Sequence, residues 1–241
     1  MTIFITGASG ATGKLLVERL IQAGHQVKII VRPGSNIPDT WNNHDKITVI
    51  RAVISEMNTD QLAAVLADCQ AVASCLGHTP NLKGIYGKPR KLVTNAVALL
   101  CNAILNSASG KPVKFVLMNT AGNSNRDLKE PVSWTQKIVI SLVRLLVPPH
   151  ADNENAADYL RVKIGQQHPA IEWVAVRPDT LTDAAHTTAY SIRVSPPRNA
   201  LFQPGKTSRI NVAHFMAQLI TDEEQWNRWK GQMPVIYNEN V

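Results

Sequence analysis

The chain has 241 residues, which suits one α/β domain or two small ones and is ample for a buried core. Hydrophobic residues make up 44% and charged residues 18%, an ordinary globular composition that argues against a disordered chain. Twenty-five Lys and Arg against 18 Asp and Glu give a formal net charge of +7, which favours anionic partners. The charge alone does not choose among nucleic acid, an acidic membrane and a phosphorylated small molecule, but the absence of any block of like charges weakens the first two.

Targeting and metal-binding patterns are also missing from the sequence. The longest apolar stretch, Ile138–Val147, is interrupted by Ser141 and Arg144 and is too short to span a bilayer. The amino-terminal residues MTIFITG have no basic region typical of a signal peptide. We therefore expect a cytoplasmic protein with neither a disulfide framework nor a metal site, because the cysteines are odd in number and lack CxxC spacing: Cys69, Cys75 and Cys101.

Short apolar runs alternate with segments whose apolar residues recur at helical spacing, so the chain is predicted to alternate between strands and helices. In chain order the expected elements are strand Thr2–Thr6, helix Lys14–Ala23, strand Val27–Val31, strand Ile47–Ile50, helix Thr59–Leu66, strand Ala71–Leu76, helix Leu92–Leu105, strand Val113–Met118, helix Trp134–Val147, helix Asn153–Gln167, strand Ile171–Val176, helix Val212–Ile220 and strand Pro234–Tyr237.

This alternation predicts an α/β fold, a Rossmann-type doubly wound parallel sheet with helices on both faces. We expect a single domain over residues 1–241, with ligands bound at the edge where the strands' carboxyl ends meet. The segment Asp183–Arg209 contains several prolines and few periodic apolar residues. It is interpreted as an irregular flap over a substrate, with a small structural subdomain as the alternative.

The strongest motif follows the first strand directly. Glycines with the spacing GxxGxxG permit a tight turn, the close approach of a pyrophosphate, and close packing of helix on strand. Amide N–H groups at the helix start would face the phosphates, and two hydroxyls could add donors. The alternative is an ordinary glycine turn. The motif comprises Gly7, Ala8, Ser9, Gly10, Ala11, Thr12 and Gly13.

The end of the second strand bears on the choice of dinucleotide. A domain that prefers NAD usually carries an acid there for the ribose hydroxyls. This chain has Arg32 and no acid before Asp39, and a guanidinium suits a 2′-phosphate. NADP is therefore favoured over NAD, although Arg32 could also be a solvated residue at a strand end.

These residues together resemble the atypical short-chain dehydrogenase/reductase superfamily, in its NmrA-like NAD(P)H-binding branch. The resemblance covers nearly the whole chain. It rests on ITGASGATG, Arg32, SCLG at Ser74–Gly77, LMNTAG at Leu117–Gly122, EWVAVRPDTLTD at Glu172–Asp183 and SRINVAHF at Ser208–Phe215.

The resemblance implies roles for particular residues. Cys75, Leu76 and Gly77 would line the ribose and pyrophosphate of the cofactor, and Pro178 would back the nicotinamide ring. Asn119 and Thr120 would sit beside the nicotinamide. Where many relatives have an Asp near adenine, this chain reads Ile50-Arg51-Ala52-Val53, so that adenine would be read by backbone around Val53.

The superfamily's usual catalytic pattern, Tyr-x-x-x-Lys, occurs once, as Tyr159 and Lys163. The two side chains share a helix face, but their depth argues against a catalytic role. If the helix starts near Asn153, Tyr159 lies roughly 9 Å and Lys163 roughly 15 Å from the ligand edge. We therefore interpret the pair as a half-exposed helix flank.

The residues expected at the ligand edge are instead those at the helix start. His150 could act as an acid or base near neutral pH, and Asp152 or Asn153 could hydrogen-bond near the ribose. The alternatives are that Asp152 or Asn153 is an ordinary N-cap, that Glu154 stabilises the first turn, and that His150 is only a loop residue.

Two functions remain open. The first is an NADP(H)-dependent oxidoreductase that acts on a small organic substrate, with Thr120 and Asn119 polarising the substrate and His150 as a proton source. The second is a non-catalytic NADP(H) sensor that regulates a protein partner, as NmrA-type members of the family do. The absence of a well-placed Tyr-Lys pair favours the sensor. Nucleic-acid binding would rest on net charge alone.

Overall fold

Strands and helices alternate along most of the chain. The structure is a computed structural model that describes residues 1–79, 81, 85–107, 110–128, 130, 147–197 and 203–239. Its strands are β1 (Thr2–Thr6), β2 (Gln26–Val31), β3 (Ile47–Arg51), β4 (Ala71–Ser74), β5 (Val113–Met118), β6 (Ile171–Pro178), β7 (Thr180–Thr182), β8 (Tyr190–Arg193), β9 (Lys206–Ser208) and β10 (Val235–Asn238). Its helices are α1 (Ala11–Gln22), α2 (Thr59–Leu66), α4 (Leu92–Asn106), α6 (Pro148–Asp158), α7 (Arg209–Thr221) and α8 (Glu223–Trp229). The predicted helix Trp134–Val147 lies outside the described residues, apart from Val147.

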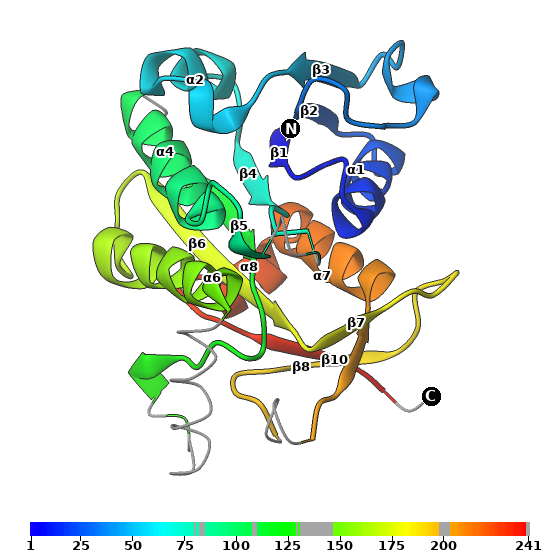
Figure 1. The fold of residues 1–241 in the computed structure, drawn as a ribbon, viewed down its shortest axis with the longest axis vertical. Coiled ribbons are helices and arrows are strands. Elements are labelled where there is room, and N and C mark those ends of the chain that lie inside the picture. Colours follow the sequence, from blue (N-terminus) through cyan, green and yellow to red (C-terminus); the bar gives the residue numbers. More distant parts are fainter. Residues whose placement is uncertain are drawn as a thin grey trace.

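The described strands form one eight-stranded sheet and a separate two-stranded one. The large sheet has the order β3-β2-β1-β4-β5-β6-β10-β8, and all its pairs are parallel except that between β10 and β8 (Figure 1). Residue Thr6 of β1 is paired with Ile30 of β2 on one side and with Ser74 of β4 on the other. The strand order therefore changes direction between β1 and β4, which is the place where open parallel sheets bind ligands.

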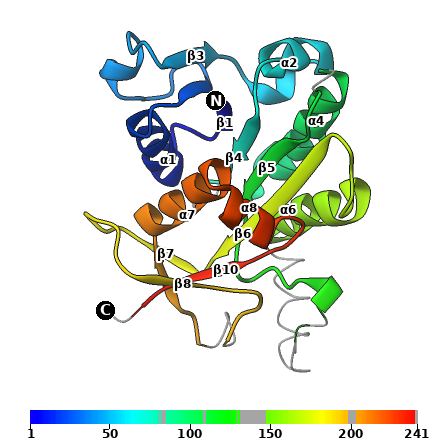
Figure 2. The same ribbon diagram turned by 180° about the vertical axis from the view of Figure 1, so that it is seen from behind.

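The two faces of the sheet carry separate hydrophobic cores. Alternate residues of β1 point to opposite sides, so Ile3 and Ile5 join one core and Phe4 joins the other. The first core is covered by α1, α7 and α8, and the second by α2, α4 and α6 (Figures 1 and 2). Burial on both faces explains the near-continuous apolar strands. The predicted Rossmann-type doubly wound sheet is confirmed.

The segment Asp183–Arg209 is less irregular than predicted, at least in its described part. Strand β8 adds to the edge of the large sheet, antiparallel to β10, and β9 pairs with β7 in the small sheet. The hydroxyl of Tyr190 lies 2.6 Å from Nδ1 of His214 and 2.8 Å from Oε1 of Gln218, which fastens β8 to α7. These strands are three or four residues long and largely polar, so they give no periodic signal.

Two helix starts differ from the prediction. Helix α1 begins at Ala11, inside the glycine motif, and not at Lys14. Helix α6 begins at Pro148 and not at Asn153, and it continues as a π-helix over Tyr159–Ile164. The two prolines predicted the end of the preceding helix, but proline also fits the first helical position, where no amide partner is needed.

Candidate functional site

The glycine motif forms a turn that passes very close to the backbone of β4. Gly7 has a φ of +76°, in the left-handed region that favours glycine. A Cβ on Gly7 would stand 2.5 Å from the carbonyl carbon and oxygen of Cys75, and one on Gly13 would stand 2.2 Å from the carbonyl oxygen of Gly7. Neither contact is sterically allowed. Both glycines are therefore required by the packing of this loop, and not only by its turn.

The start of α1 offers amide donors at the surface of that loop. Gly10 is the N-cap and supplies no side-chain cap, so the first-turn amides lack an intrahelical acceptor. Gly10 and Ala11 are exposed and Ser9 is half-buried, whereas Thr12 is buried. Because the helix dipole adds positive potential here, this end of α1 suits a diphosphate. Ser9, more than Thr12, is placed to add a hydroxyl donor.

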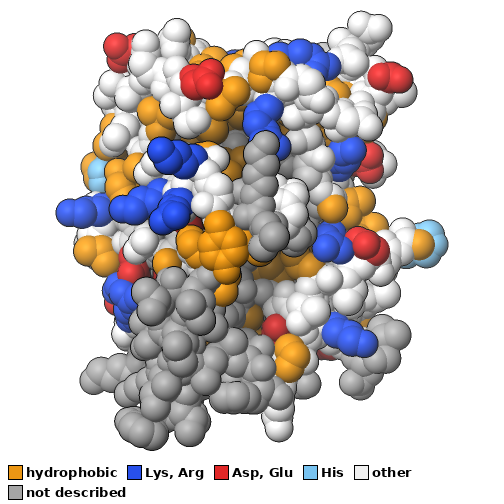
Figure 3. Space-filling model, viewed as in Figure 1, with side chains coloured by type: hydrophobic (Ala, Val, Ile, Leu, Met, Phe, Trp, Pro, Cys, Tyr) orange, Lys and Arg blue, Asp and Glu red, His pale blue; other side chains and the backbone are white. Residues whose placement is uncertain are grey.

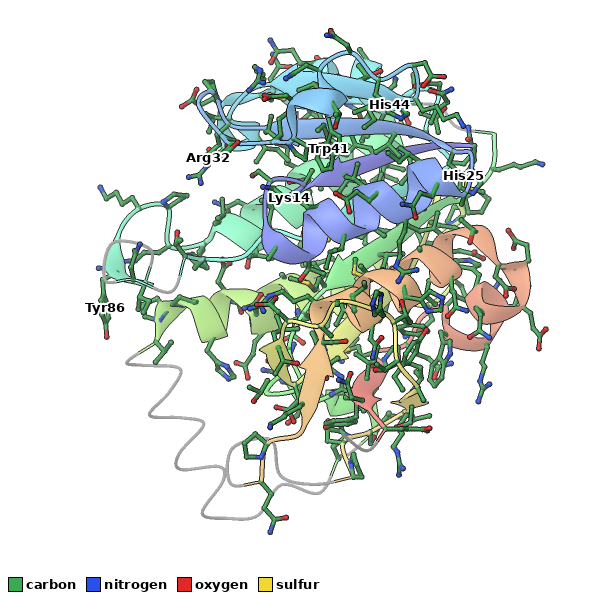
Figure 4. The ribbon with its side chains drawn as sticks, turned by 90° about the vertical axis from the view of Figure 1, so that its right-hand side faces the viewer. Lys14, His25, Arg32, Trp41, His44 and Tyr86 are labelled. Atoms are coloured by element: carbon green, nitrogen blue, oxygen red, sulfur yellow. The ribbon has the colours of Figure 1, made fainter. Side chains whose placement is uncertain are left out.

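Arg32 directly follows β2 and is exposed. In the described part of the chain, its guanidinium has neither a hydrogen-bond nor an ion-pair partner. Figure 4 shows Arg32 and Lys14 on the same side of the molecule, the side at which α1 begins. Val53 follows β3 and is half-buried. At the predicted adenosine end of the site, Arg32 therefore offers a positive charge with no described partner, and no acid follows β2 before Asp39.

The end of β4 supplies backbone to the site. The amide of Cys75 donates to the carbonyl of Thr6 at 2.9 Å, and Leu76 and Gly77 then leave the sheet. Burial raises the pKa of the Cys75 thiol to about 12, so the thiol stays protonated and is a poor nucleophile. Cys75 therefore fits a packing role beside Gly7.

Asn119, which follows β5, is buried and joins the turn after β5 to α6. Its Oδ1 accepts hydrogen bonds from the amide of Thr120 at 2.9 Å and from Nδ2 of Asn123 at 3.2 Å. Its own Nδ2 donates to the carbonyl of Asn153 at 2.8 Å. The second N–H of this amide has no hydrogen-bond acceptor among the described residues. Thr120, by contrast, is half-buried, and its Oγ1 accepts only the amide of Gly122 at 3.2 Å, so its hydroxyl proton is free to donate.

His150 lies in the first turn of α6, against the turn that follows β5. A Cβ on Gly122 would stand 3.3 Å from Cε1 of His150. The Nε2 atom of His150 is buried, lies 3.5 Å from Oε1 of Glu154, and has no hydrogen-bond partner among the described residues. Thr120 and His150 therefore both border Gly122, and the structure brings together two of the three residues to which the sequence analysis assigned a catalytic role.

Pro178 and its neighbour close the same region from β6. The carbonyl of Pro178 accepts the amide of Ala121 at 2.8 Å, so the turn after β5 is bound to the end of β6. Arg177 is fully buried and forms an ion pair with Glu130 at 2.7 Å. It also donates to the carbonyl of Asn123 at 2.7 Å. Sequence reasoning missed this pair, although an arginine inside an apolar strand is itself a signal of a buried partner.

Asp152 does not cap its own helix, so the interpretation as an N-cap is wrong. Because α6 begins at Pro148, Asp152 lies one turn inside it, fully buried against the start of α4. Its carboxylate accepts the amides of Val93 at 2.8 Å and Thr94 at 3.0 Å, and Nε2 of His78 lies 2.8 Å from Oδ2. Asp152 therefore caps a different helix, α4, and also holds the segment that follows β4.

Tyr159 and Lys163 lie even further from the helix start than the sequence indicated. Counted from Pro148, Tyr159 is about 16 Å along the axis. Tyr159 packs against the core beneath α4, where burial and the nearby Cys101 raise the pKa of its hydroxyl, and Lys163 is exposed. The geometry argues against this pair as a proton relay.

Other features of the described chain do not form a second site of this kind. A hollow of about 370 Å³ lies at the opposite end of β6, lined by Gly165, Gln166, Gln167, His168, Ile171, Glu172, Trp173, Lys230 and Gly231. Among the described residues no three His, Cys, Asp or Glu side chains gather to hold a metal ion. In that same part of the chain no helix is both long and apolar enough to cross a membrane.

Comparison with known proteins decides the family. The family model described as NAD(P)H-binding matches residues 7–223, most of the chain. The chain belongs to this NAD(P)H-binding family. The match begins at the first glycine of the loop and ends in α8, so it includes every predicted cofactor residue.

Solved structures with this fold include named reductases. The chain is 17% identical to the oxidoreductase ylbE from Lactococcus lactis, with a TM-score of 0.69 over 100% of this chain and 92% of that one. It is 15% identical to a short-chain dehydrogenase/reductase from Veillonella parvula in complex with NADP (TM-score 0.70; 99% and 95% covered). It is 14% identical to an anaerobilin reductase from Escherichia coli (TM-score 0.67; 100% and 98% covered). At these identities the likeness shows the fold.

A sequence relative is found among plant proteins. Over 79 residues the chain is 35% identical to an uncharacterised chloroplastic protein of Arabidopsis thaliana. The matched stretch is 32% of this chain and 28% of the plant protein, so the chain spans well under two thirds of that relative's length.

Proposed function

We propose that this protein is an NADP(H)-dependent oxidoreductase of the atypical short-chain dehydrogenase type, acting on a small organic substrate. In this proposal one domain, residues 1–241, binds both dinucleotide and substrate. The observation that carries it is the glycine cradle. Gly7 is packed so tightly against the backbone after β4, and Gly13 against Gly7, that neither position has room for a Cβ, and the turn leads into first-turn amides of α1 that have no acceptor among the described residues.

The preference for NADP over NAD rests on charge at the adenosine end. Arg32 is exposed without a described partner, and Lys14 lies on the same side of the molecule (Figure 4). A guanidinium binds a phosphate with paired, charge-assisted hydrogen bonds, whereas it offers little to a ribose hydroxyl. The similar fold of an NADP complex from Veillonella parvula supports this choice.

The substrate would lie beyond the nicotinamide, at the ends of β5 and β6. The bound cofactor supplies the hydride chemistry, while the protein orients the reactants and excludes water. The hydroxyl of Thr120 is free to donate to a substrate oxygen, and Asn119 retains one N–H. His150, whose Nε2 has no described hydrogen-bond partner, would hold the transferred proton. Pro178 would back the nicotinamide.

We also propose a cytoplasmic location. All three cysteines are free and buried, as is usual for proteins in a reducing compartment.

A second function, a dinucleotide-dependent regulator of a partner protein, is favoured by one specific observation. The Tyr159–Lys163 pair packs away from the ligand edge, so the usual proton relay of short-chain dehydrogenases is displaced. A regulator requires dinucleotide binding at the glycine loop but does not require a proton relay.

Titration calorimetry with NADPH and NADH, followed by turnover with carbonyl compounds, quinones and flavins, separates the two functions. Tight NADPH binding with oxidation of NADPH by one of these substrates supports the oxidoreductase. Tight binding without turnover, together with redox-dependent capture of a protein, supports the regulator. Absence of heat and of any shift in melting temperature with either dinucleotide refutes both.

A further inference from the structure

A short basic segment, Tyr86–Lys91, directly precedes α4. Its sequence is Tyr-Gly-Lys-Pro-Arg-Lys, so three cations occupy four successive positions. Lys88, Arg90 and Lys91 are all exposed, and none of their side chains has a hydrogen-bond or ion-pair partner among the described residues. Tyr86 exposes 52% of its surface.

The base of this segment is held in place by a single buried carboxylate. Oδ2 of Asp152 lies 2.8 Å from Nε2 of His78, which precedes the segment, and accepts the amide of Val93, which follows it, at 2.8 Å. Thr94 donates its hydroxyl to the other oxygen at 2.6 Å. His78, before the segment, and Val93, directly after it, are thus joined through one carboxylate. The basic segment adjoins this anchored start of α4, so it is a positioned surface and not a free tail.

The loop stands at the carboxyl edge of the sheet. It begins where β4 ends, immediately after Cys75–Gly77. Figure 4 shows Tyr86 on the same side of the molecule as Arg32 and Lys14, across the start of α1 from Arg32. Because α4 packs beside α6, the segment lies toward the half of the edge that carries His150 and the end of β5. This is the half at which the substrate would bind.

The charge of the segment is uncompensated within the described chain. Three like charges repel one another, and they adjoin the amino end of α4, which carries positive potential of its own. Several cations elsewhere have close carboxylate partners, such as Lys114 with Glu223 at 2.6 Å and Arg126 with Asp158 at 2.6 Å. Figure 3, which views this edge from the front, shows Lys and Arg side chains on both sides of the face, several of them close together on the left. An anion would relieve this repulsion.

We propose that the basic segment recognises the substrate, and that the substrate is an aromatic anion: a flat ring system carrying a phosphate or carboxylate. The ring would stack on Tyr86 and the anionic group would bind Lys88, Arg90 and Lys91. This inference rests on the proposed function, because it assigns the substrate class of the same site.

Two flavins that differ by one phosphate test the charge. FMN and riboflavin share the same ring, so their binding to the NADP⁺-loaded protein, followed by flavin fluorescence, isolates the contribution of the phosphate. At low ionic strength we expect FMN to bind about tenfold or more tightly than riboflavin, as one or two charge-assisted hydrogen bonds would give. The difference should shrink as salt is raised.

The test variant is the triple substitution Lys88→Gln/Arg90→Gln/Lys91→Gln. It should abolish the preference for FMN and leave riboflavin and NADPH affinities unchanged. Its matched control removes the same three charges elsewhere, from exposed residues: Lys163→Gln/Lys206→Gln/Arg228→Gln. The control should keep the preference. Tyr86→Ala should weaken both flavins by a similar factor.

Three results would overturn the inference. One is equal affinity of the wild-type protein for the two flavins, or no binding of FMN at all. Another is an FMN preference that survives the triple substitution or disappears equally in the control. The third is a loss of NADPH affinity in the triple variant that matches the loss for FMN, since the segment would then belong to the cofactor. Failure of the proposed function has a different signature: no binding of either dinucleotide to the wild-type protein.

Discussion

Replacing Gly7 with alanine tests the close approach of the glycine loop to β4. The substitution places a Cβ 2.5 Å from the carbonyl carbon and oxygen of Cys75, and 2.7 Å from the amide nitrogen of Leu76. All three are backbone atoms of a central strand end, so they cannot rotate away. Overpacking of this kind costs roughly 1–3 kcal/mol. The positive φ of +76° adds roughly 1–2 kcal/mol for any residue with a Cβ.

Gly24→Ala is the matched control. Gly24 has a similar φ of +87°, but a Cβ there meets no atom within 4 Å. It therefore carries the backbone strain of roughly 1–2 kcal/mol without the clash. Chemical denaturation should show Gly7→Ala losing about 2–5 kcal/mol and Gly24→Ala only the smaller amount. Calorimetry should show a loss of NADPH affinity of about tenfold or more for Gly7→Ala alone, because separating β1 from β4 displaces the amides of the cradle.

A milder variant covers the case in which Gly7→Ala does not fold. A Cβ on Gly10 would lie 3.2 Å from the carbonyl oxygen of Gly7, a contact that a small shift relieves, and Gly10 is exposed at the surface of the cradle. Gly10→Ala should fold and bind NADPH less tightly. Wild-type affinity in both Gly10→Ala and Gly7→Ala would refute the cradle.

Four further predictions concern single residues. Arg32→Asp should lower the ratio of NADPH to NADH affinity by about tenfold or more, as expected for a charge-assisted contact, and an unchanged ratio would remove Arg32 from the site. Tyr159→Phe should leave turnover nearly unchanged, and a loss of several hundredfold would contradict its position beneath α4. Asp152→Asn should lower the free energy of unfolding by about 3–5 kcal/mol, whereas Asp158→Asn, which alters a partly exposed ion pair, should cost about 1 kcal/mol or less; equal costs would contradict the buried cap. Burial, reinforced by the guanidinium of Arg19, lowers the pKa of His214 below 6.5, so that His214 binds a proton at higher pH in the unfolded chain than in the folded one. The free energy of unfolding should therefore fall as the pH drops below 6.5. Thermal melts of His214→Gln should show a smaller fall, and identical pH profiles of the variant and the wild type would contradict this role of His214.

The fold was largely predictable because its signals are local. Each buried strand of the parallel sheet is a short apolar run, and Gly7 to Gly13 combine a turn, a helix start and a close approach within seven residues. The short edge strand β8 was not predictable, because Tyr190–Arg193 is held by pairing with β10 and not by an apolar pattern of its own. The start of α6 was missed because Pro148 fits both a helix end and a helix beginning.

The sequence predicted those site residues whose location follows from their place directly after a strand. The positions of the glycines and of Arg32 follow from their place after β1 and β2. The role of Asp152 does not, because its partners Val93 and Thr94 are 59 and 58 residues away in the sequence. A carboxylate near a helix start is ordinarily assigned to that helix, and only tertiary packing shows that it caps another one.

Among the described residues, the buried charged side chains Asp152, Glu154 and Arg177 lie at the ligand edge, and this distribution supports a positioned site there. Asp152 holds His78 and the start of α4, and the ion pair of Arg177 with Glu130 joins the end of β6 to the residues after β5. At the opposite edge, the pair of Lys230 and Glu172 is partly exposed. A buried ion pair adds little stability for its desolvation cost, but it fixes geometry, since any displacement leaves a charge without its partner. Loops held in this way keep their side chains at fixed distances from one another, which is what binding and catalysis at this edge require.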